Sequence, residues 1–150
     1  MTLAVKSAQS SLAATNPALT DQGAISIFEN SDITAQLSVG WKEYNDLNGE
    51  ARIATGDIDG DKKDEIIIGL GPVAGNAAIP GGKFQILDHD FTSLGWGQID
   101  WDDYNSINGE SWPACGDIDG DGIDEILIGL GAGGNGRVEV FKFKNGQAVL

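Results

Sequence analysis

Short runs of β-branched residues that end in glycine recur along the chain and predict strands. EIIIGLG (65–71) and EILIGLG (125–131) are continuous apolar runs, which is typical of strands buried on both faces. ISIFEN (25–30), FQILDHD (84–90) and RVEVFKF (137–143) alternate with an approximate period of two, as in strands with one buried face. No stretch carries apolar residues at helical spacing for three turns without a glycine, so the pattern predicts no helix.

These elements belong to a repeat. Residues 41–71 align with residues 101–131 at an offset of 60, and twenty of the 31 aligned positions are identical. After a loop of different length, GGKFQIL (81–87) aligns with NGRVEVF (135–141), and QGAISIF (22–28) is an earlier partial copy. The chain therefore holds about two and a half units, each roughly 60 residues long.

Each complete unit is predicted to contain four strands. The predicted strands are 51–56, 65–70, 83–88 and about 93–101 in one unit, and 111–116, 125–130 and 137–143 in the next. The aromatic but charged segments WKEYN and WDDYN are predicted to form an outer strand or its turn. Four strands in about 40–60 residues are typical of a propeller blade. We therefore predict an all-β fold, a partial β-propeller of about two and a half four-stranded antiparallel blades.

The repeat also divides the chain. Residues 22–50 are predicted to form a partial blade, 51–110 a full blade, and 111–150 a second partial blade. Residues 1–21 are predicted to be an irregular lead or a degenerate strand, because TLAVKSA (2–8) lies a suitable distance before ISIF but lacks an acidic loop.

An aspartate-rich segment, GDIDGDKKDE (56–65), is repeated as GDIDGDGIDE (116–125). In each copy aspartates stand at positions 1, 3 and 5 of a tight loop and a glutamate stands at position 9. Alternate spacing points the carboxylates toward one centre, and the glycine between them permits the sharp turn. Such hard oxygen ligands suit Ca²⁺, which binds about 6–8 oxygens. We expect two Ca²⁺ per chain, with ligands that include the backbone carbonyl at position 7: Asp57, Asp59, Asp61, Lys63 and Glu65 in the first loop, and Asp117, Asp119, Asp121, Ile123 and Glu125 in the second.

The distribution of charge favours this assignment. The net charge is −14, and ten of the 23 acidic residues lie in these two segments. Carboxylates crowded in this way repel one another unless a cation lies among them. Asp64 and Asp124, at position 8, are expected to point away from the ion and to orient the loop.

Two other interpretations of the loops were weighed. An EF-hand needs a bidentate glutamate at position 12 and a flanking helix on each side, whereas position 12 here is Ile68 or Ile128 inside a predicted strand. A solvated acidic turn without an ion is the remaining alternative. The glutamate that recurs at position 9 favours a metal site over that alternative.

The composition argues against several other functions. The excess of acid disfavours nucleic acid and anionic lipid as partners, since both are polyanions. No apolar run approaches the roughly 18 residues of a membrane span, so we predict no membrane insertion. His89 is the only histidine and Cys115 the only cysteine. We interpret the histidine as a surface turn residue and the cysteine as a buried, inert thiol, and we predict no catalytic activity.

The segments DIDGDKKDEIIIGLG and DIDGDGIDEILIGLG resemble the FG-GAP or VCBS repeat family, the blades of integrin α-subunit propellers, of many bacterial surface proteins and of fungal lectins. The resemblance covers residues 41–150 well and 22–40 partially. It implies a β-propeller in which Ca²⁺ lies in the hairpin between the first two strands of a blade. The family's Gly-Ala-Pro after the second strand is Gly-Leu-Gly here, and members close rings of about seven blades, which this chain alone cannot do.

These inferences predict a partner and a role. We expect self-association, in which two or three chains complete one ring, unless the chain is a fragment of a longer array. The expected role is a binding or adhesion module with a protein or glycan ligand, located outside the cell or at its surface, where Ca²⁺ is plentiful. The alternative is a propeller lectin that binds glycans through aromatic residues such as Tyr104. The competing interpretation is that Trp41 and Trp101, which are equivalent in the repeat, are scaffold residues.

Overall fold

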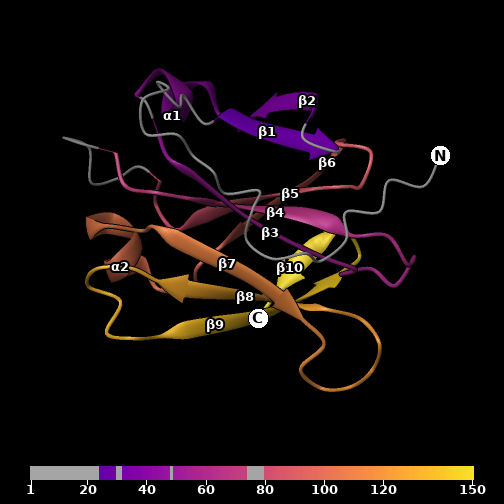
Figure 1. The fold of residues 1–150 in the computed structure, drawn as a ribbon. Coiled ribbons are helices and arrows are strands. Elements are labelled where there is room, and N and C mark those ends of the chain that lie inside the picture. Colours follow the sequence, from indigo (N-terminus) through magenta and orange to yellow (C-terminus); the bar gives the residue numbers. More distant parts are fainter. Residues whose placement is uncertain (1–23, 30–31, 48, 74–79) are drawn as a thin grey trace.

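The computed structural model describes residues 24–29, 32–47, 49–73 and 80–150. These residues form ten strands and two short helices (Figure 1). The elements in chain order are β1 (Ala24–Glu29), β2 (Asp32–Ser38), α1 (Lys42–Asp46), β3 (Ala51–Gly56), β4 (Glu65–Leu70), β5 (Lys83–Leu87), β6 (Ser93–Gln98), α2 (Asp102–Ile107), β7 (Ser111–Gly116), β8 (Glu125–Leu130), β9 (Val138–Lys144) and β10 (Gln147–Val149). The predicted lead at 1–21 lies outside the described residues.

The strands form three antiparallel sheets. β1 pairs with β2, the middle sheet has the order β3-β4-β5-β6, and the last sheet has the order β7-β8-β9-β10. The mostly β character of the chain is therefore confirmed. Within both four-stranded sheets each strand pairs with the next in sequence, which is what short hairpin connections favour.

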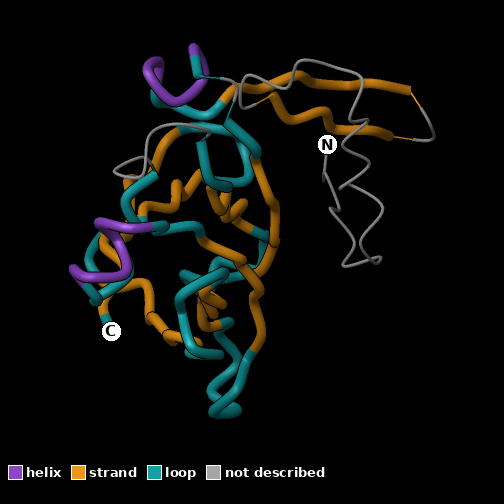
Figure 2. Tube along the Cα trace, turned by 90° about the vertical axis from the view of Figure 1, so that its left-hand side faces the viewer, coloured by secondary structure: helices purple, strands orange, loops and turns teal. Residues whose placement is uncertain are grey.

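The three sheets are stacked, and apolar layers fill the space on both sides of the middle sheet (Figures 1 and 2). β4 is buried along its whole length, as its continuous apolar sequence predicts. Ile66, Ile68 and Leu70 belong to the layer shared with β1 and β2. Ile67 belongs to the layer shared with the last sheet, because successive side chains of a strand point to opposite faces.

The two helices correct the prediction that WKEYN and WDDYN form an outer strand or its turn. α1 and α2 are single helical turns that follow β2 and β6 and end before β3 and β7. Trp41 stacks on Tyr44 with ring centroids 5.9 Å apart, and Trp101 stacks on Tyr104 at 5.7 Å. A pair three residues apart stabilises one helical turn, which is too short for an apolar periodicity to reveal.

Three further differences concern where a strand ends and which strands are present. β6 ends at Gln98 rather than near residue 101. β2, for which the repeat predicted no separate strand, pairs with β1. The last sheet gains a fourth strand, β10, which pairs Ala148 with Phe143.

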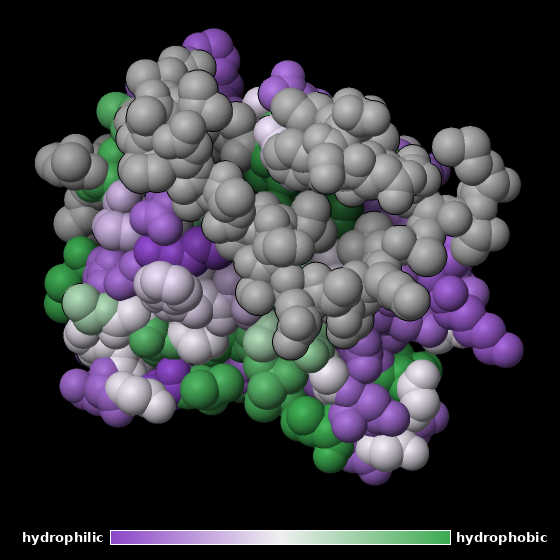
Figure 3. Space-filling model, viewed as in Figure 1, coloured by the Kyte–Doolittle hydropathy of each residue, from purple (hydrophilic) through white to green (hydrophobic). Residues whose placement is uncertain are grey.

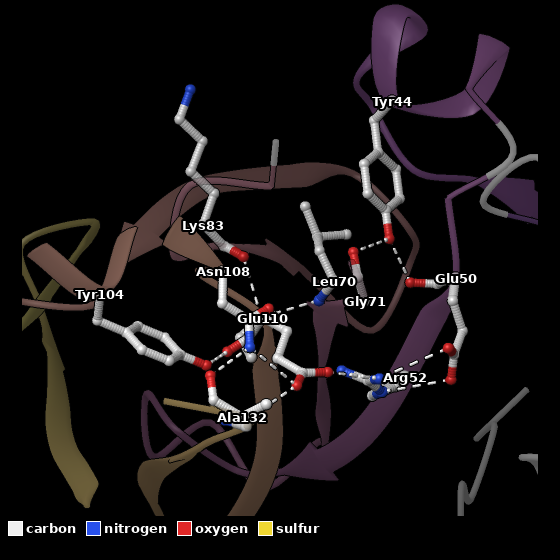
Figure 4. Close-up of polar contacts among 12 residues, drawn as sticks. Tyr44, Glu50, Arg52, Leu70, Gly71, Lys83, Tyr104, Asn108, Glu110 and Ala132 are labelled. Atoms are coloured by element: carbon white, nitrogen blue, oxygen red, sulfur yellow. Dashed lines mark hydrogen bonds and ion pairs between the residues drawn. The ribbon is translucent and has the colours of Figure 1, made fainter. Parts of the chain in front are cut away.

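A buried polar network joins the middle and last sheets (Figure 4). Arg52 on β3 forms an ion pair with Glu110 at 2.9 Å, and both side chains are largely buried. The Tyr104 hydroxyl donates to the Glu110 carbonyl at 2.7 Å and accepts from the Gly131 N–H at 2.7 Å. Burial raises the pKa of Glu110, but hydrogen bonds from Ala132, Asn108 and Arg52 outweigh it, so the pKa lies below its usual value. The network fixes the last sheet against the middle one.

Candidate metal centre

Both aspartate-rich segments form the hairpin loop between the first two strands of a four-stranded sheet, β3–β4 and β7–β8. Figure 1 shows the two loops on the same side of the molecule, with α1 and α2 on the opposite side. Gly60 and Gly120 have φ values of 84° and 80°, the left-handed conformation that favours glycine. Flanking strands, rather than helices, agree with the rejection of an EF-hand.

In the first loop, backbone N–H groups donate hydrogen bonds to both carboxylate oxygens of Asp57 and to one oxygen each of Asp59 and Asp61. Asp57 accepts from Gly60 at 2.7 Å and from Lys62 at 2.9 Å. Asp59 Oδ1 accepts from the Asp61 N–H at 3.0 Å, and Asp61 Oδ1 accepts from the Lys63 N–H at 2.8 Å. Oxygens of the three aspartates lie within 4.8 Å of one another. The predicted convergence of Asp57, Asp59 and Asp61 is present.

The second loop repeats these contacts. Asp117 accepts from Gly120 at 2.6 Å and from Gly122 at 2.9 Å, and Asp121 Oδ1 accepts from Ile123 at 2.9 Å. Oxygens of Asp117, Asp119 and Glu125 lie within 4.8 Å of one another. In both loops the position 1 aspartate accepts backbone hydrogen bonds at both oxygens, whereas the aspartates at positions 3 and 5 accept them at Oδ1 alone.

The position 9 glutamates lie beneath the loops and are buried. Glu65 Oε2 accepts from the Ile58 N–H at 3.0 Å, and Glu125 Oε2 accepts from the Ile118 N–H at 3.0 Å. Within the described part of the chain Glu65 Oε1 has no hydrogen-bond partner, and the whole residue is buried. Burial raises the pKa of Glu65 to about 7, and the charges of Asp59, Asp61 and Asp57 add to the shift. An orphaned buried carboxylate oxygen beside three aspartates fits a cation site.

The two loops differ at one equivalent position of the third strand and its end: Lys142 lies within β9, and Asp88 directly follows β5. In the second loop, Lys142 Nζ lies 2.6 Å from Asp119 Oδ2, 3.0 Å from Asp121 Oδ2 and 3.0 Å from Glu125 Oε1. β4 and β8 pair in the same register with β5 and β9, so that Leu87 corresponds to Phe141. Asp88 therefore occupies in the first unit the place of Lys142. Asp88, His89 and Glu65 offer ligand atoms within 4.8 Å of one another.

Lys142, Asp88 and the position of His89 beside Glu65 were missed by the sequence analysis. The signal was present, because extending the alignment of 81–87 with 135–141 by one residue places Asp88 opposite Lys142. His89 lies in the turn that follows β5, half-buried near the site, and its Nε2 is 3.1 Å from Lys63 Nζ. For Lys63 and Ile123 the structure gives the backbone N–H contacts above, and the role of their carbonyls as ligands stays a prediction.

The position 8 aspartate of the second loop, Asp124, connects the two loops. Asp124 Oδ2 accepts from the Asp57 N–H at 3.1 Å, and the Asp124 N–H donates to the Asp57 carbonyl at 2.8 Å. Burial raises the pKa of Asp64, and the nearby charges of Asp124 and Asp57 raise it further. Asp124 therefore orients the loop of the preceding unit, not only its own.

A separate cavity of about 410 Å³ lies on the side of the middle sheet and is lined by Gly40, Trp41, Lys83, Trp96, Gly97 and Gln98. The rings of Trp41 and Trp96 meet edge to face with centroids 6.3 Å apart. Lys83 Nζ lies 4.6 Å from the centroid of the Trp41 ring. The cavity thus combines two indole rings with an ammonium and an amide.

Burial raises the pKa of the Cys115 thiol to about 12, and the charges of Asp124, Asp64 and Glu65 add to this effect. At neutral pH the thiol is protonated, which is unfavourable for a nucleophile.

Among the described residues no helix is long and apolar enough to cross a membrane. Comparison with models of known protein families gave no match, and comparison with curated proteins gave none either.

Proposed function

We propose that this chain is a calcium-stabilised β-propeller module of the FG-GAP or VCBS type, which serves binding or adhesion without catalysis. The observation that carries the proposal is the convergence of carboxylate oxygens in each loop over a buried glutamate. The expected role of Ca²⁺ is structural. It neutralises the crowded carboxylates and fixes the hairpin, so its binding free energy adds to the stability of the fold.

The arrangement of the sheets supports a propeller. The middle and last sheets have the same strand order, and equivalent strands lie beside each other, with β3 next to β7 and β6 next to β10. Sheets that stack face to face in this way, with first strands together and fourth strands together, match the packing of neighbouring blades around an axis.

The exposed face of the last sheet supports the presence of a further blade. In the middle sheet, Ile67, Phe84 and Ile86 are fully buried against the last sheet. Their equivalents by register are Leu127, Val138 and Val140, and the last two are 55% and 37% exposed. The same contrast separates Ile58 at 0% from Ile118 at 58% exposure. Figure 3 shows apolar surface among polar side chains over the part of the molecule that contains β7–β9.

We propose that a second copy of the chain covers this face, so that two or three chains complete a ring. The alternative, a fragment of a longer array, would place another blade there instead. Light scattering after size-exclusion chromatography, with and without Ca²⁺, tests this. Val140→Asp should yield monomers, and Ile107→Asp, on the exposed side of α2, should leave the oligomer intact. A wild-type chain that stays monomeric in Ca²⁺ would contradict self-association.

Thermal melting tests the metal. The melting temperature should rise in CaCl₂ relative to excess EGTA, and MgCl₂ at the same concentration should act less, because Mg²⁺ demands a smaller octahedral site. Asp59→Ala and Asp119→Ala should each remove one site and leave the other. A melting curve that is the same in EGTA and in CaCl₂ would contradict a calcium role.

The second candidate is a lectin, and the cavity between Trp41 and Trp96 is the observation that favours it. Indole faces pack against the C–H faces of sugars, while Lys83 and Gln98 could bond hydroxyl or acidic groups. A glycan array tests this, with Trp96→Ala as the variant that should lose the signal. Trp112→Ala, which changes an exposed indole outside the cavity, is the matched control. The expected location remains extracellular or at the cell surface, where Ca²⁺ is abundant.

A further inference from the structure

The two aspartate loops are almost identical in sequence and backbone contacts, yet opposite charges stand beside them. The second loop faces Lys142 and the first faces Asp88, at the same position of the repeat. The loop carboxylates, the buried glutamate and the hairpin register are shared, although the first loop carries Lys62 and Lys63 where the second has Gly122 and Ile123. The difference between Asp88 and Lys142 is the one that reaches the buried glutamate, because Lys142 Nζ lies 3.0 Å from Glu125 Oε1 and Asp88 offers a ligand atom within 4.8 Å of Glu65.

Lys142 already occupies the place of a cation. Its ammonium contacts the free oxygens of Asp119, Asp121 and Glu125 at 2.6 Å to 3.0 Å. These are oxygens that the backbone leaves unbonded, whereas Oδ1 of Asp121 and Oε2 of Glu125 are held by N–H groups. A divalent ion must displace this ammonium and bind beside its positive charge.

In the first loop Lys63 Nζ lies 3.4 Å from Asp61 Oδ2, but among the described residues no ammonium contacts Glu65. Glu65 Oε1, the counterpart of the oxygen that meets Lys142, is buried and has no hydrogen-bond partner among the residues that the structure describes. Asp88 adds a carboxylate beside it, within 4.8 Å of the Glu65 and His89 ligand atoms. The orphaned buried oxygen and the equivalent position of Lys142 Nζ are two independent indications that a positive charge belongs here.

We infer that the two loops are unequal cation sites: the first binds a divalent cation tightly with help from Asp88, and the second carries its own counter-ion, Lys142, and binds the cation weakly. This inference rests on the proposed calcium role of the loops. It makes the position occupied by Asp88 in the first unit and Lys142 in the second the determinant of which blade depends on the metal and which is neutralised by the chain itself.

A charge exchange tests the inference in the full chain. Asp119→Asn isolates the first loop and Asp59→Asn isolates the second. Calorimetric titration of metal-stripped protein with CaCl₂ should give an affinity at least tenfold higher for the first loop. In the isolated second loop, Lys142→Asp should raise the affinity at least tenfold, and Lys142→Met should raise it by less. In the isolated first loop, Asp88→Lys should lower the affinity at least tenfold.

Matched controls separate the local effect from net charge. Lys144→Met changes an exposed lysine on the same strand, and Asp102→Lys changes an exposed aspartate in α2, at the opposite end of the sheets from the loops. Both should leave the affinities unchanged. Circular dichroism of each metal-free variant reports whether the sheets have formed. Lys142→Met removes the positive charge without reversing it, so it is a smaller change than Lys142→Asp.

The outcomes distinguish this inference from the proposed function. Equal Ca²⁺ affinities in the two isolated loops, or a second loop that Lys142→Met and Lys142→Asp do not tighten, would overturn the inference and leave a calcium-stabilised module standing. No heat of binding and no thermal shift at millimolar CaCl₂ in either loop would overturn both. A tenfold preference for the first loop that the exchange reverses supports both.

Discussion

Asp57 and Asp124 exchange two hydrogen bonds across neighbouring loops. The Asp57 N–H donates to Asp124 Oδ2 at 3.1 Å, and the Asp124 N–H donates to the Asp57 carbonyl at 2.8 Å. Asp57 is the first residue of its own predicted metal set, while Asp124 adjoins the buried Glu125 of the next. The backbone of one candidate site is thus positioned by a residue of the other.

Removal of this contact should destabilise the chain. We expect Asp124→Ala to lower the free energy of unfolding by about 1–2 kcal/mol, because the Asp57 N–H loses its acceptor in a partly buried place. Asp124→Asn, which retains an oxygen acceptor, should cost less. Asp64→Ala is the control, since the described residues record no hydrogen bond to the Asp64 side chain. Urea unfolding in EGTA measures all three, and an equal loss for Asp64→Ala would contradict the argument.

The buried Glu65 should make the metal-free chain less stable as the pH rises. Its pKa in the folded chain is about 7, compared with an ordinary value of 4.5. The protonated carboxyl therefore contributes stability in full below about pH 4.5, and this contribution is lost as the pH rises toward 7, in total about 2–3 kcal/mol. Asp64 shifts in the same direction.

Chemical unfolding of metal-stripped protein between pH 5 and 8 measures this trend. Glu65→Gln cannot ionise and should flatten the profile over that range. Saturating CaCl₂ should reverse the sign of the wild-type slope, because Ca²⁺ binds the ionised carboxylate. A wild-type profile as flat as that of Glu65→Gln would show that the side chain is ionised in the folded metal-free state.

Equivalent apolar residues on the two sheets should differ in their contribution to stability. Ile67 is fully buried between sheets, whereas Leu127 is only partly buried on the outer face. Ile67→Ala should cost about 3–4 kcal/mol and Leu127→Ala about 1–2 kcal/mol in monomeric protein. At high protein concentration the cost of Leu127→Ala should grow if a second copy covers the face. Similar costs under dilute conditions would mean that the outer face is already covered.

Gly109 should be intolerant of a side chain. Its φ is 66°, and a Cβ added there would lie 2.4 Å from the Gly82 nitrogen, which itself donates to the Gly109 carbonyl at 2.7 Å. Gly109→Ala should therefore cost more than about 2 kcal/mol. Gly133 has a φ of 85° with open space around it, so Gly133→Ala should cost only about 1 kcal/mol. Thermal melts of the two variants, compared at the same pH and calcium concentration, give the difference.

The strands and the aspartate loops could be predicted from the sequence, because each depends on local chemistry and each occurs twice in the repeat. The run at 65–70 has the length and β-branched composition of a buried strand, and β4 has those bounds. Alternating aspartates with an intervening glycine prescribe a tight turn, and the structure brings Asp57, Asp59 and Asp61 together. The helices were missed because Trp41 and Tyr44 stabilise a single turn by a side-chain contact, without any repeating apolar pattern.

The environment of the loops was decided only by the tertiary structure. Lys142 and Asp88 come from the end of the third strand, and the sheet register alone brings them against Glu125 and beside Glu65. Likewise, Ile67 and Leu127 occupy equivalent places in the repeat, and only the stacking of the sheets buries Ile67 fully and Leu127 in part. The sequence determined the local conformation, since that depends on neighbouring residues. Charge pairing and burial depend on contacts between distant strands, so the fold decided them.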